Sequence, residues 1–277
     1  MITELKGEDT RLAVRKAAAP EIDSVDASAE SSNTRRALAL VHGMTEENRL
    51  PSLGTLLPAL RRRGFEVTVV AADDEAVPMP RPDDYQVLVV MGSHDSVYDD
   101  HLVWIARERD YLLGAVDAGI PVFGVCFGAQ MLAHLFGGTV QRGELSEHGL
   151  TVIDTRDPDL VGAGPWLEFH HDAITAPASA DVVATTAAGV QAFTVGPHMG
   201  VQFHPEASPA WLRAWSSSIP DMESYLASHG LDLASFTESV GGDTDISAAV
   251  ECDVLFGRFL ERAGIARPSR PMPGSAD

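Results

Sequence analysis

One cysteine of this chain lies where its thiol could act as a nucleophile. Cys126 stands in the segment GVCFG (124–128), where a short apolar run gives way to a helical pattern. The segment has the form of the G-x-S-x-G turn, in which a tight strand-to-helix connection exposes a nucleophile and glycines remove side chains that would collide. The free amides and the positive dipole end of the following helix favour a thiolate at this position. The alternative is a small buried residue at a strand end, which is common for cysteine.

A cysteine nucleophile also needs a base, and the base needs a group that orients it. The segment GVQFHPEAS (200–208) offers His204 at the end of a strand-like run and Glu206 two residues later. Residues i and i+2 of an extended segment face the same way, so Glu206 would contact one imidazole nitrogen while the other faces the thiol. Taken alone, this segment is equally well a turn that ends a strand. Together with GVCFG, it favours a Cys–His–Glu set.

The elements that must position these residues alternate between strand and helix. Apolar runs predict four strands, at 37–43, 65–72, 85–92 and 121–126. Helices are expected at 99–119 and 127–136, with a short or kinked helix within 49–64 because of Pro58. This alternation predicts an α/β fold with a doubly wound, mostly parallel sheet flanked by helices.

The pattern changes after residue 138. Short β-like runs predict a small antiparallel extension and one last central strand, at 139–142, 150–155, 181–186, 191–196 and 200–204. Residues 207–265 look helical, and Cys252 lies there on an apolar stripe with Leu255 and Phe259. We therefore expect Cys252 to be a core residue without a chemical role.

Charge and composition limit the classes of function. A net charge of −20 repels phosphate backbones and anionic lipid, so we expect neither a nucleic-acid partner nor a membrane partner. Two distant cysteines and the lack of a secretory signal suit a cytoplasmic protein. Both lysines, Lys6 and Lys16, lie near the start of the chain, so the folded part has no Walker-type ATP site. An energy-coupled step would therefore need another protein.

The motifs GVCFGAQ and FHPE together resemble those of class I (triad-type) glutamine amidotransferases. Three further stretches are similar to that family: VVMGSHDSVYDD (89–100), ELSEHGL (144–150) and FHHD (169–172). The resemblance covers about residues 36–215 and extends to stand-alone members related to the amidotransferase domain of GMP synthase. It implies a flavodoxin-like fold. The expected regions are a disordered tail (1–34), the amidotransferase domain (35–215), a helical extension packed on it (216–265) and a loose tail (266–277).

The resemblance implies a role for each matching residue. Cys126 would attack the side-chain amide of glutamine and form a γ-glutamyl thioester, His204 would move the proton, and Glu206 would hold the imidazole. Backbone amides of Ser93, Phe127 and Gly92 would form the oxyanion hole. The residues that would bind the substrate are Gln130, His170 and Asp172, although structural polar packing is nearly as good an interpretation of the last two. We expect no cofactor and no metal ion.

One position departs from the family pattern. His94 replaces the usual proline of the oxyanion loop, so it either reshapes the pocket or faces solvent.

Three functions fit these residues. The first is hydrolysis of glutamine with release of ammonia to a partner synthase. The second is hydrolysis of other γ-glutamyl amides or peptides by the same residues, with a larger amine as the leaving group. The third is a non-catalytic binding domain on the same scaffold, against which the intact Cys–His–Glu set argues.

Overall fold

The computed structural model describes residues 34–241 and 243–265 of the 277-residue chain. The predicted tails at 1–34 and 266–277 lie outside the described residues, apart from Thr34. The strands are β1 (Arg35–Val41), β2 (Phe65–Ala71), β3 (Val87–Val90), β4 (Val122–Val125), β5 (Thr139–Thr151), β6 (Asp154–Thr155), β7 (Trp166–Thr175), β8 (Asp181–Thr186), β9 (Gly189–Val195) and β10 (His198–Val201). The α-helices are α1 (Glu46–Arg49), α2 (Leu56–Arg62), α3 (Val103–Asp117), α4 (Phe127–Leu135), α5 (Pro209–Ser217), α6 (Met222–Ser228), α7 (Leu233–Ser239) and α8 (Asp243–Arg262). Two short 3-10 helices are η1 (Pro51–Leu53) and η2 (Pro82–Asp84).

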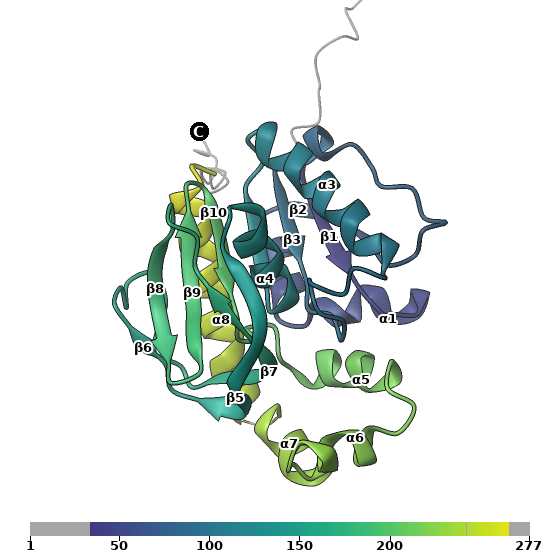
Figure 1. Ribbon diagram of the computed structural model, residues 1–277, viewed down its shortest axis with the longest axis vertical. Helices are drawn as coiled ribbons and strands as arrows, with labels where there is room; N and C mark the ends of the chain where they lie inside the picture. Colours follow the sequence, from purple (N-terminus) through teal and green to yellow (C-terminus); the bar gives the residue numbers. More distant parts are fainter. Residues whose placement is uncertain (1–33, 242, 266–277) are drawn as a thin grey trace, which may run out of the picture. The chain divides into compact units, whose positions relative to one another are not determined.

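Eight strands form one sheet in the order β2-β1-β3-β4-β10-β9-β8-β6 (Figure 1). Neighbouring strands are parallel from β2 to β10, and β9, β8 and β6 continue the sheet antiparallel. Strands β3 and β4 are buried along their whole length, as parallel strands covered on both faces must be. The predicted doubly wound sheet with an antiparallel extension is therefore confirmed. In such sheets ligands bind beyond the carboxyl ends of the parallel strands.

The last central strand differs from its predicted position. Strand β10 ends at Val201, and the chain then leaves the sheet, so His204 instead forms an isolated bridge with Leu167 of β7. The run at 200–204 was predicted from its short β-like pattern, and all five residues are indeed buried. Beyond β10, Phe203 packs in the core, where its ring stacks on that of Trp166 with a centroid distance of 4.6 Å.

Strand β7 was not predicted from the sequence. It pairs with β5 in a separate antiparallel ribbon that has a bulge between Arg142 and Glu147. Its sequence, WLEFHHDAIT, carries charged residues where a buried strand would be apolar. Glu168 and His170 are nevertheless buried, because they pair with each other at 3.3 Å. Because these residues are charged, the hydropathy of the sequence does not predict the strand.

The helix expected within 49–64 is divided into η1 and α2, preceded by α1. Pro51 begins η1, and Pro58 lies in the first turn of α2, where a missing N–H breaks no helical hydrogen bond. Gly54 separates the two pieces with a φ of 48°. The prediction of a short or interrupted helix is therefore confirmed.

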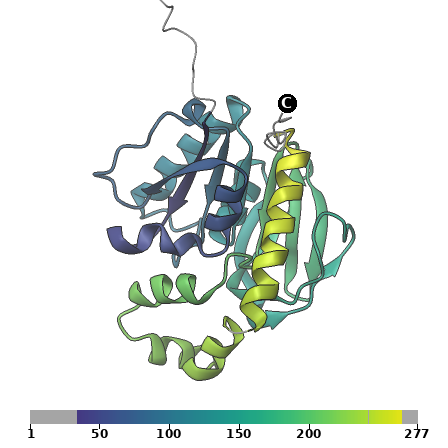
Figure 2. The same ribbon diagram turned by 180° about the vertical axis from the view of Figure 1, so that it is seen from behind.

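Helices cover both faces of the sheet. Helices α3 and α4 pack on one face, and α2 and α8 pack on the other, where Figure 2 shows α8 running along the strands. Cys252 of α8 is fully buried in this second core, as predicted. Among the described residues, no helix combines the length and the apolar character needed to cross a membrane.

Helix α8 should be an integral part of the core. Phe259 is fully buried with its ring 5.1 Å from that of Phe123, so Phe259→Ala should lower the free energy of unfolding by about 3–5 kcal/mol. Val254 on the same helix is 41% exposed, and Val254→Ala should change it by less than about 0.5 kcal/mol. Urea denaturation followed by circular dichroism measures both. Equal, small losses would show that α8 is only loosely attached.

Candidate active site

The backbone at Cys126 turns sharply between β4 and α4. Cys126 has φ 51° and ψ −106°, and no other non-glycine residue in the described part of the chain has a positive φ. A Cβ on Gly124 would lie 2.4 Å from the carbonyl oxygen of Gly128, so the turn closes only when position 124 lacks a side chain. The N–H of Cys126 donates to the carbonyl of Val201 at 2.8 Å, which ties the turn to β10.

His204 and Glu206 form a buried pair beside this turn. The Nδ1 atom of His204 lies 2.8 Å from a carboxylate oxygen of Glu206. The pair is made in a turn, whereas the sequence predicted an extended segment. Thr55 fixes that turn, because its N–H donates to the carbonyl of Glu206 at 3.0 Å and its hydroxyl donates to the carbonyl of Pro205 at 2.8 Å.

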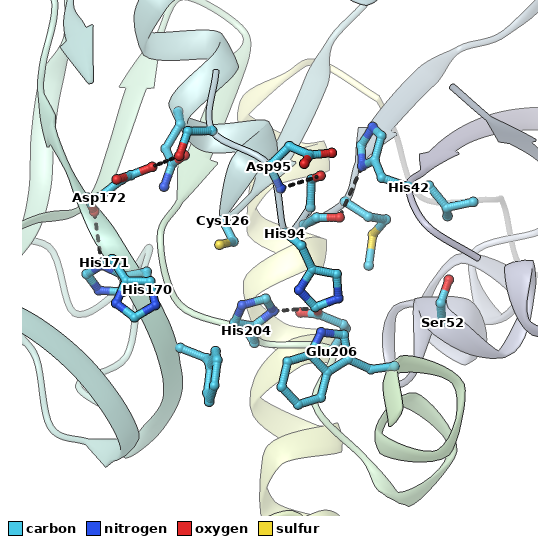
Figure 3. A pocket seen from close by; sticks show the side chains of 18 of the residues that line it. His42, Ser52, His94, Asp95, Cys126, His170, His171, Asp172, His204 and Glu206 are labelled. Atoms are coloured by element: carbon cyan, nitrogen blue, oxygen red, sulfur yellow. Dashed lines mark hydrogen bonds and ion pairs between the residues drawn. The ribbon is translucent and has the colours of Figure 1, made fainter. Parts of the chain in front are cut away.

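The structure brings Cys126 and His204 together. A Cβ built on Gly92 would lie 3.6 Å from the Cβ of Cys126 and 3.2 Å from Cε1 of His204, so both side chains lie next to this glycine. Figure 3 shows Cys126 and His204 in the same pocket. Burial opposes the charged imidazole, but the charges of Glu206 and Cys126 and hydrogen bonds to both outweigh it. They raise the pKa of His204 well above its usual range. The imidazole therefore holds its proton next to the sulfur.

The residues proposed for the oxyanion hole lie on two segments next to Cys126. Phe127 is the first residue of α4, where backbone N–H groups have no partner within the helix. Gly92 and Ser93 follow β3 and line the pocket that also contains Cys126 and His204. Gly92 also lies next to the Cβ of Cys126, and Phe127 directly follows Cys126 in the chain.

Sequence reasoning missed His42 and Glu108. His42 follows β1, and its Nδ1–H donates to the carbonyl of Gly92 at 3.0 Å, while its Nε2 lies 2.8 Å from the carboxylate of Glu108. Both partners accept hydrogen bonds, so the imidazole satisfies them by carrying both protons. Burial disfavours this charge, but Glu108 outweighs burial and raises the pKa of His42. Nothing in the sequence set VHG apart from an ordinary strand end.

Gln202 is a second neighbour of the sulfur that the sequence did not reveal. Its Nε2 lies 3.5 Å from Sγ of Cys126, and its Oε1 accepts from Gln130 at 3.2 Å. Gln130, one of the predicted substrate-binding residues, is buried and lines the pocket. The two amides form a short chain that ends at the thiol.

His170 and Asp172 also line the pocket, but other protein groups occupy their polar atoms. Nδ1 of His170 donates to the carbonyl of Asp172 at 3.0 Å, and its Nε2 lies near two carboxylates, those of Glu147 and Glu168. Burial works against the charge, yet these carboxylates raise the pKa of His170 to about 10. The carboxylate of Asp172 accepts hydrogen bonds from Ser96 and Tyr98. These two residues therefore join β7 to its surroundings as well as facing the pocket.

His94 is one of the residues that line the pocket. Its side chain is exposed, its ring stacks on Trp215 with a centroid distance of 5.7 Å, and its Nε2 lies 3.1 Å from the hydroxyl of Ser218. Desolvation by the surrounding rings lowers the pKa of His94. His94 therefore both faces solvent and shapes the pocket, so neither of the two expectations describes it fully.

Comparisons with known proteins agree with this geometry. The class I glutamine amidotransferase family model matches residues 53–212, which is more than half of the chain. One subunit of the glutamine-hydrolysing GMP synthase of Saccharolobus solfataricus is 32% identical over 154 residues, covering 50% of this chain and 79% of that protein. The glutamine-hydrolysing GMP synthase of Mycobacterium leprae is 39% identical over 127 residues, covering 43% of this chain. The chain spans only 23% of that longer protein.

Solved structures share the fold. A glutamine amidotransferase of Thermotoga maritima superposes with a TM-score of 0.71 at 22% identity, covering 82% of this chain and 99% of that chain. A second, from Methylobacillus flagellatus, gives a TM-score of 0.67 at 20% identity, covering 86% and 97%. At these identities the structural likeness shows only that the fold is shared. The family model and the curated relatives show the family relationship. This chain belongs to the class I glutamine amidotransferase family.

Proposed function

We propose that this chain hydrolyses the side-chain amide of glutamine through a γ-glutamyl thioester on Cys126 and releases ammonia for a partner synthase. The observation that carries the proposal is the convergence of Cys126, at a positive-φ turn, with the buried His204–Glu206 pair. A positioned thiol, a base and a group that orients the base are what nucleophilic catalysis requires. Membership of the class I glutamine amidotransferase family supports glutamine as the substrate.

The proposed reaction begins when His204 takes the thiol proton of Cys126, and the raised pKa of His204 makes its imidazole a stronger base. The sulfur attacks the amide carbon, and the carbonyl electrons move to the oxygen, which accepts hydrogen bonds from the N–H groups of Ser93 and Phe127. Each such donor contributes about 10²–10³ in rate. The carbon–nitrogen bond then breaks, and His204 gives its proton to the departing ammonia. Water, deprotonated by His204, cleaves the thioester and releases glutamate.

His42 supports this reaction from a distance. By donating to the carbonyl of Gly92, it fixes the peptide between Gly92 and Ser93. A trans peptide directs its N–H opposite to its carbonyl, so this bond sets the direction of the Ser93 N–H. We therefore assign His42 a positioning role in the oxyanion hole, with Glu108 holding its ring.

We assign the step that consumes ammonia to another protein or domain. The relative in S. solfataricus is named as one subunit of GMP synthase, and the relative in M. leprae is more than four times as long as the segment it shares with this chain. The present chain has no lysine after residue 16 with which to build a Walker-type ATP site. These observations support a division of labour in which this chain supplies only ammonia.

The aromatic side of the pocket favours one alternative. His94, Phe169, Trp215 and Tyr225 line the pocket that contains Cys126, and such a wall suits a leaving group larger than ammonia. A γ-glutamyl amide hydrolase would use the same thioester with an amine as the leaving group. Rates of ammonia release from glutamine and of amine release from γ-glutamyl amides separate the two functions. Faster turnover of the amides would favour the alternative.

Cys126→Ser should keep the fold and lower glutamine turnover by several orders of magnitude, on the order of 10⁴ or more. Cys252→Ala is the matched control and should retain most of the activity, because Cys252 is fully buried in the core. A diazoketone analogue of glutamine should label Cys126 alone, since burial raises the pKa of Cys252 to about 12. Mass spectrometry of peptides reads the labelled site. Equal labelling of both thiols in the folded protein would count against the assignment.

The charge state of His204 should depend on Glu206. Replacing Glu206 by Gln removes a charge that favours the imidazolium, so the pKa of His204 should fall and the ring should lose its proton at a lower pH than in the wild type. A pH titration followed by NMR of the histidine ring measures the shift. Glu66→Gln removes an equal charge from an exposed strand position and should leave His204 unchanged. An unaltered titration in Glu206→Gln would contradict the proposed pair.

His42→Leu should lower kcat about tenfold to a hundredfold with a smaller effect on KM, because a misdirected oxyanion donor affects the transition state more than the bound substrate. Glu108→Gln should be milder, since a neutral His42 still donates to the carbonyl of Gly92. Steady-state kinetics on both variants tests this order. Equal activities of His42→Leu and wild type would mean that the ring serves only for packing.

A further inference from the structure

Three histidines outside the Cys126 site converge at one place. They come from three elements: His148 from β5, His171 from β7 and His229 from the carboxyl end of α6. One ring nitrogen of each lies within 4.8 Å of one nitrogen of each of the others. Their ring centroids are 4.8–5.1 Å apart. We call this group the histidine cluster.

Two members of the cluster are held by partners on the far side of the ring. Nδ1 of His229 donates to the carbonyl of Tyr225 at 2.7 Å, which leaves a lone pair on Nε2. Nδ1 of His171 lies 3.2 Å from the hydroxyl of Ser146, a group that can donate or accept. The two Nε2 atoms are 3.0 Å apart, so one of them carries a proton in the metal-free state. Ligand histidines in metal sites are oriented by this kind of second hydrogen bond.

The third member has an unsatisfied nitrogen. Nε2 of His148 is buried and has no hydrogen-bond partner among the described residues. A buried polar atom without a partner is unfavourable. The Nε2 atom of His148 is therefore free to bind an added group, such as a metal ion.

We propose that His148, His171 and His229 form a binding site for Zn²⁺. Zinc takes imidazole nitrogens at about 2.0–2.1 Å in a tetrahedral arrangement, which places the ligand atoms about 3.3 Å apart. The present separations of 3.0 Å to at most 4.8 Å need only small rotations of the rings to reach that value. On binding, His171 changes tautomer: its proton moves from Nε2 to Nδ1, where the hydroxyl of Ser146 accepts it, and Nε2 is free for the ion. The rings are half-buried, so water reaches the fourth position.

A second group of possible ligands nearby does not fit a metal. Glu147, Glu168 and His170 also lie close together, but the two carboxylates raise the pKa of His170 to about 10. A protonated imidazole has no lone pair at Nε2 for a cation, and it already neutralises the carboxylates. Of these two described groups, only the histidine cluster therefore offers ring nitrogens that do not already face a carboxylate.

Zinc in the cluster would fasten α6 to the β5–β7 ribbon. Tyr225 of α6 and His171 of β7 both line the pocket that contains Cys126, and Figure 3 shows His171 on the wall next to His170. The ion would thus fix one wall of the pocket without touching the sulfur. This inference does not rest on the proposed reaction.

The proposal is tested by measuring zinc binding to the full chain. The protein is purified without a histidine tag, and bound metal is removed with a chelator. Isothermal titration calorimetry in excess Mg²⁺ should show one Zn²⁺ per chain. His148→Gln, His171→Gln and His229→Gln should each weaken binding by at least about a hundredfold, because each removes a ligand. His101→Gln and His134→Gln change exposed histidines elsewhere and should bind as the wild type does. Cys126→Ala should also bind normally, which separates this site from the thiol.

Two further measurements stay informative if a cluster variant folds poorly. Co²⁺ bound to the wild type should give the intense visible absorption of a tetrahedral site, and Zn²⁺ should bleach it. Zn²⁺ should also slow amide hydrogen exchange in α6 of the wild type but not of His229→Gln. Absence of stoichiometric zinc binding, weak octahedral Co²⁺ bands, or binding that survives the cluster variants but is lost in Cys126→Ala would each overturn the proposal.

Discussion

The left-handed backbone at Cys126 is the constraint on which the rest of the site depends. A non-glycine residue in this conformation costs about 1–3 kcal/mol, and the surrounding structure must hold it in place. Here α4 packs directly against the strands: a Cβ on Gly128 would lie 2.2 Å from the carbonyl oxygen of Val90 in β3. The absence of a side chain at Gly128 allows this close approach. Burial of α4 against β3, β4 and β10 supplies the free energy that offsets the strain.

The second half of the site is held by a different close approach. A Cβ on Gly54 would lie 1.9 Å from the carbonyl oxygen of Glu206, so the backbone after η1 touches the turn that carries the His–Glu pair. Thr55 then fixes the same turn through two hydrogen bonds. His204 is therefore positioned by the segment after η1, and Cys126 is positioned by the central strands. The two side chains meet only when both parts of the fold are in place.

Buried histidines in this protein divide according to their neighbours. His42, His170 and His204 each contact a carboxylate, and in each case that contact outweighs burial and raises the pKa of the ring. His148 is surrounded by other imidazoles, and burial together with their charge lowers its pKa. A neighbouring carboxylate thus raises the pKa of a buried ring, whereas burial without a carboxylate lowers it, as it does for His198.

The sequence alone determined the alternating architecture, the interruption of the first helix, the core role of Cys252 and the candidate set of Cys126, His204 and Glu206. These follow from local chemistry: strand runs, glycines around a thiol, and a His-Pro-Glu segment. Only the tertiary structure decided that β10 ends before His204, that His42 supports Gly92 and that three distant histidines meet. It also revealed β7, whose buried charged residues are stable only when paired with one another. Such contacts join residues that are remote in sequence. No local sequence pattern can therefore indicate them.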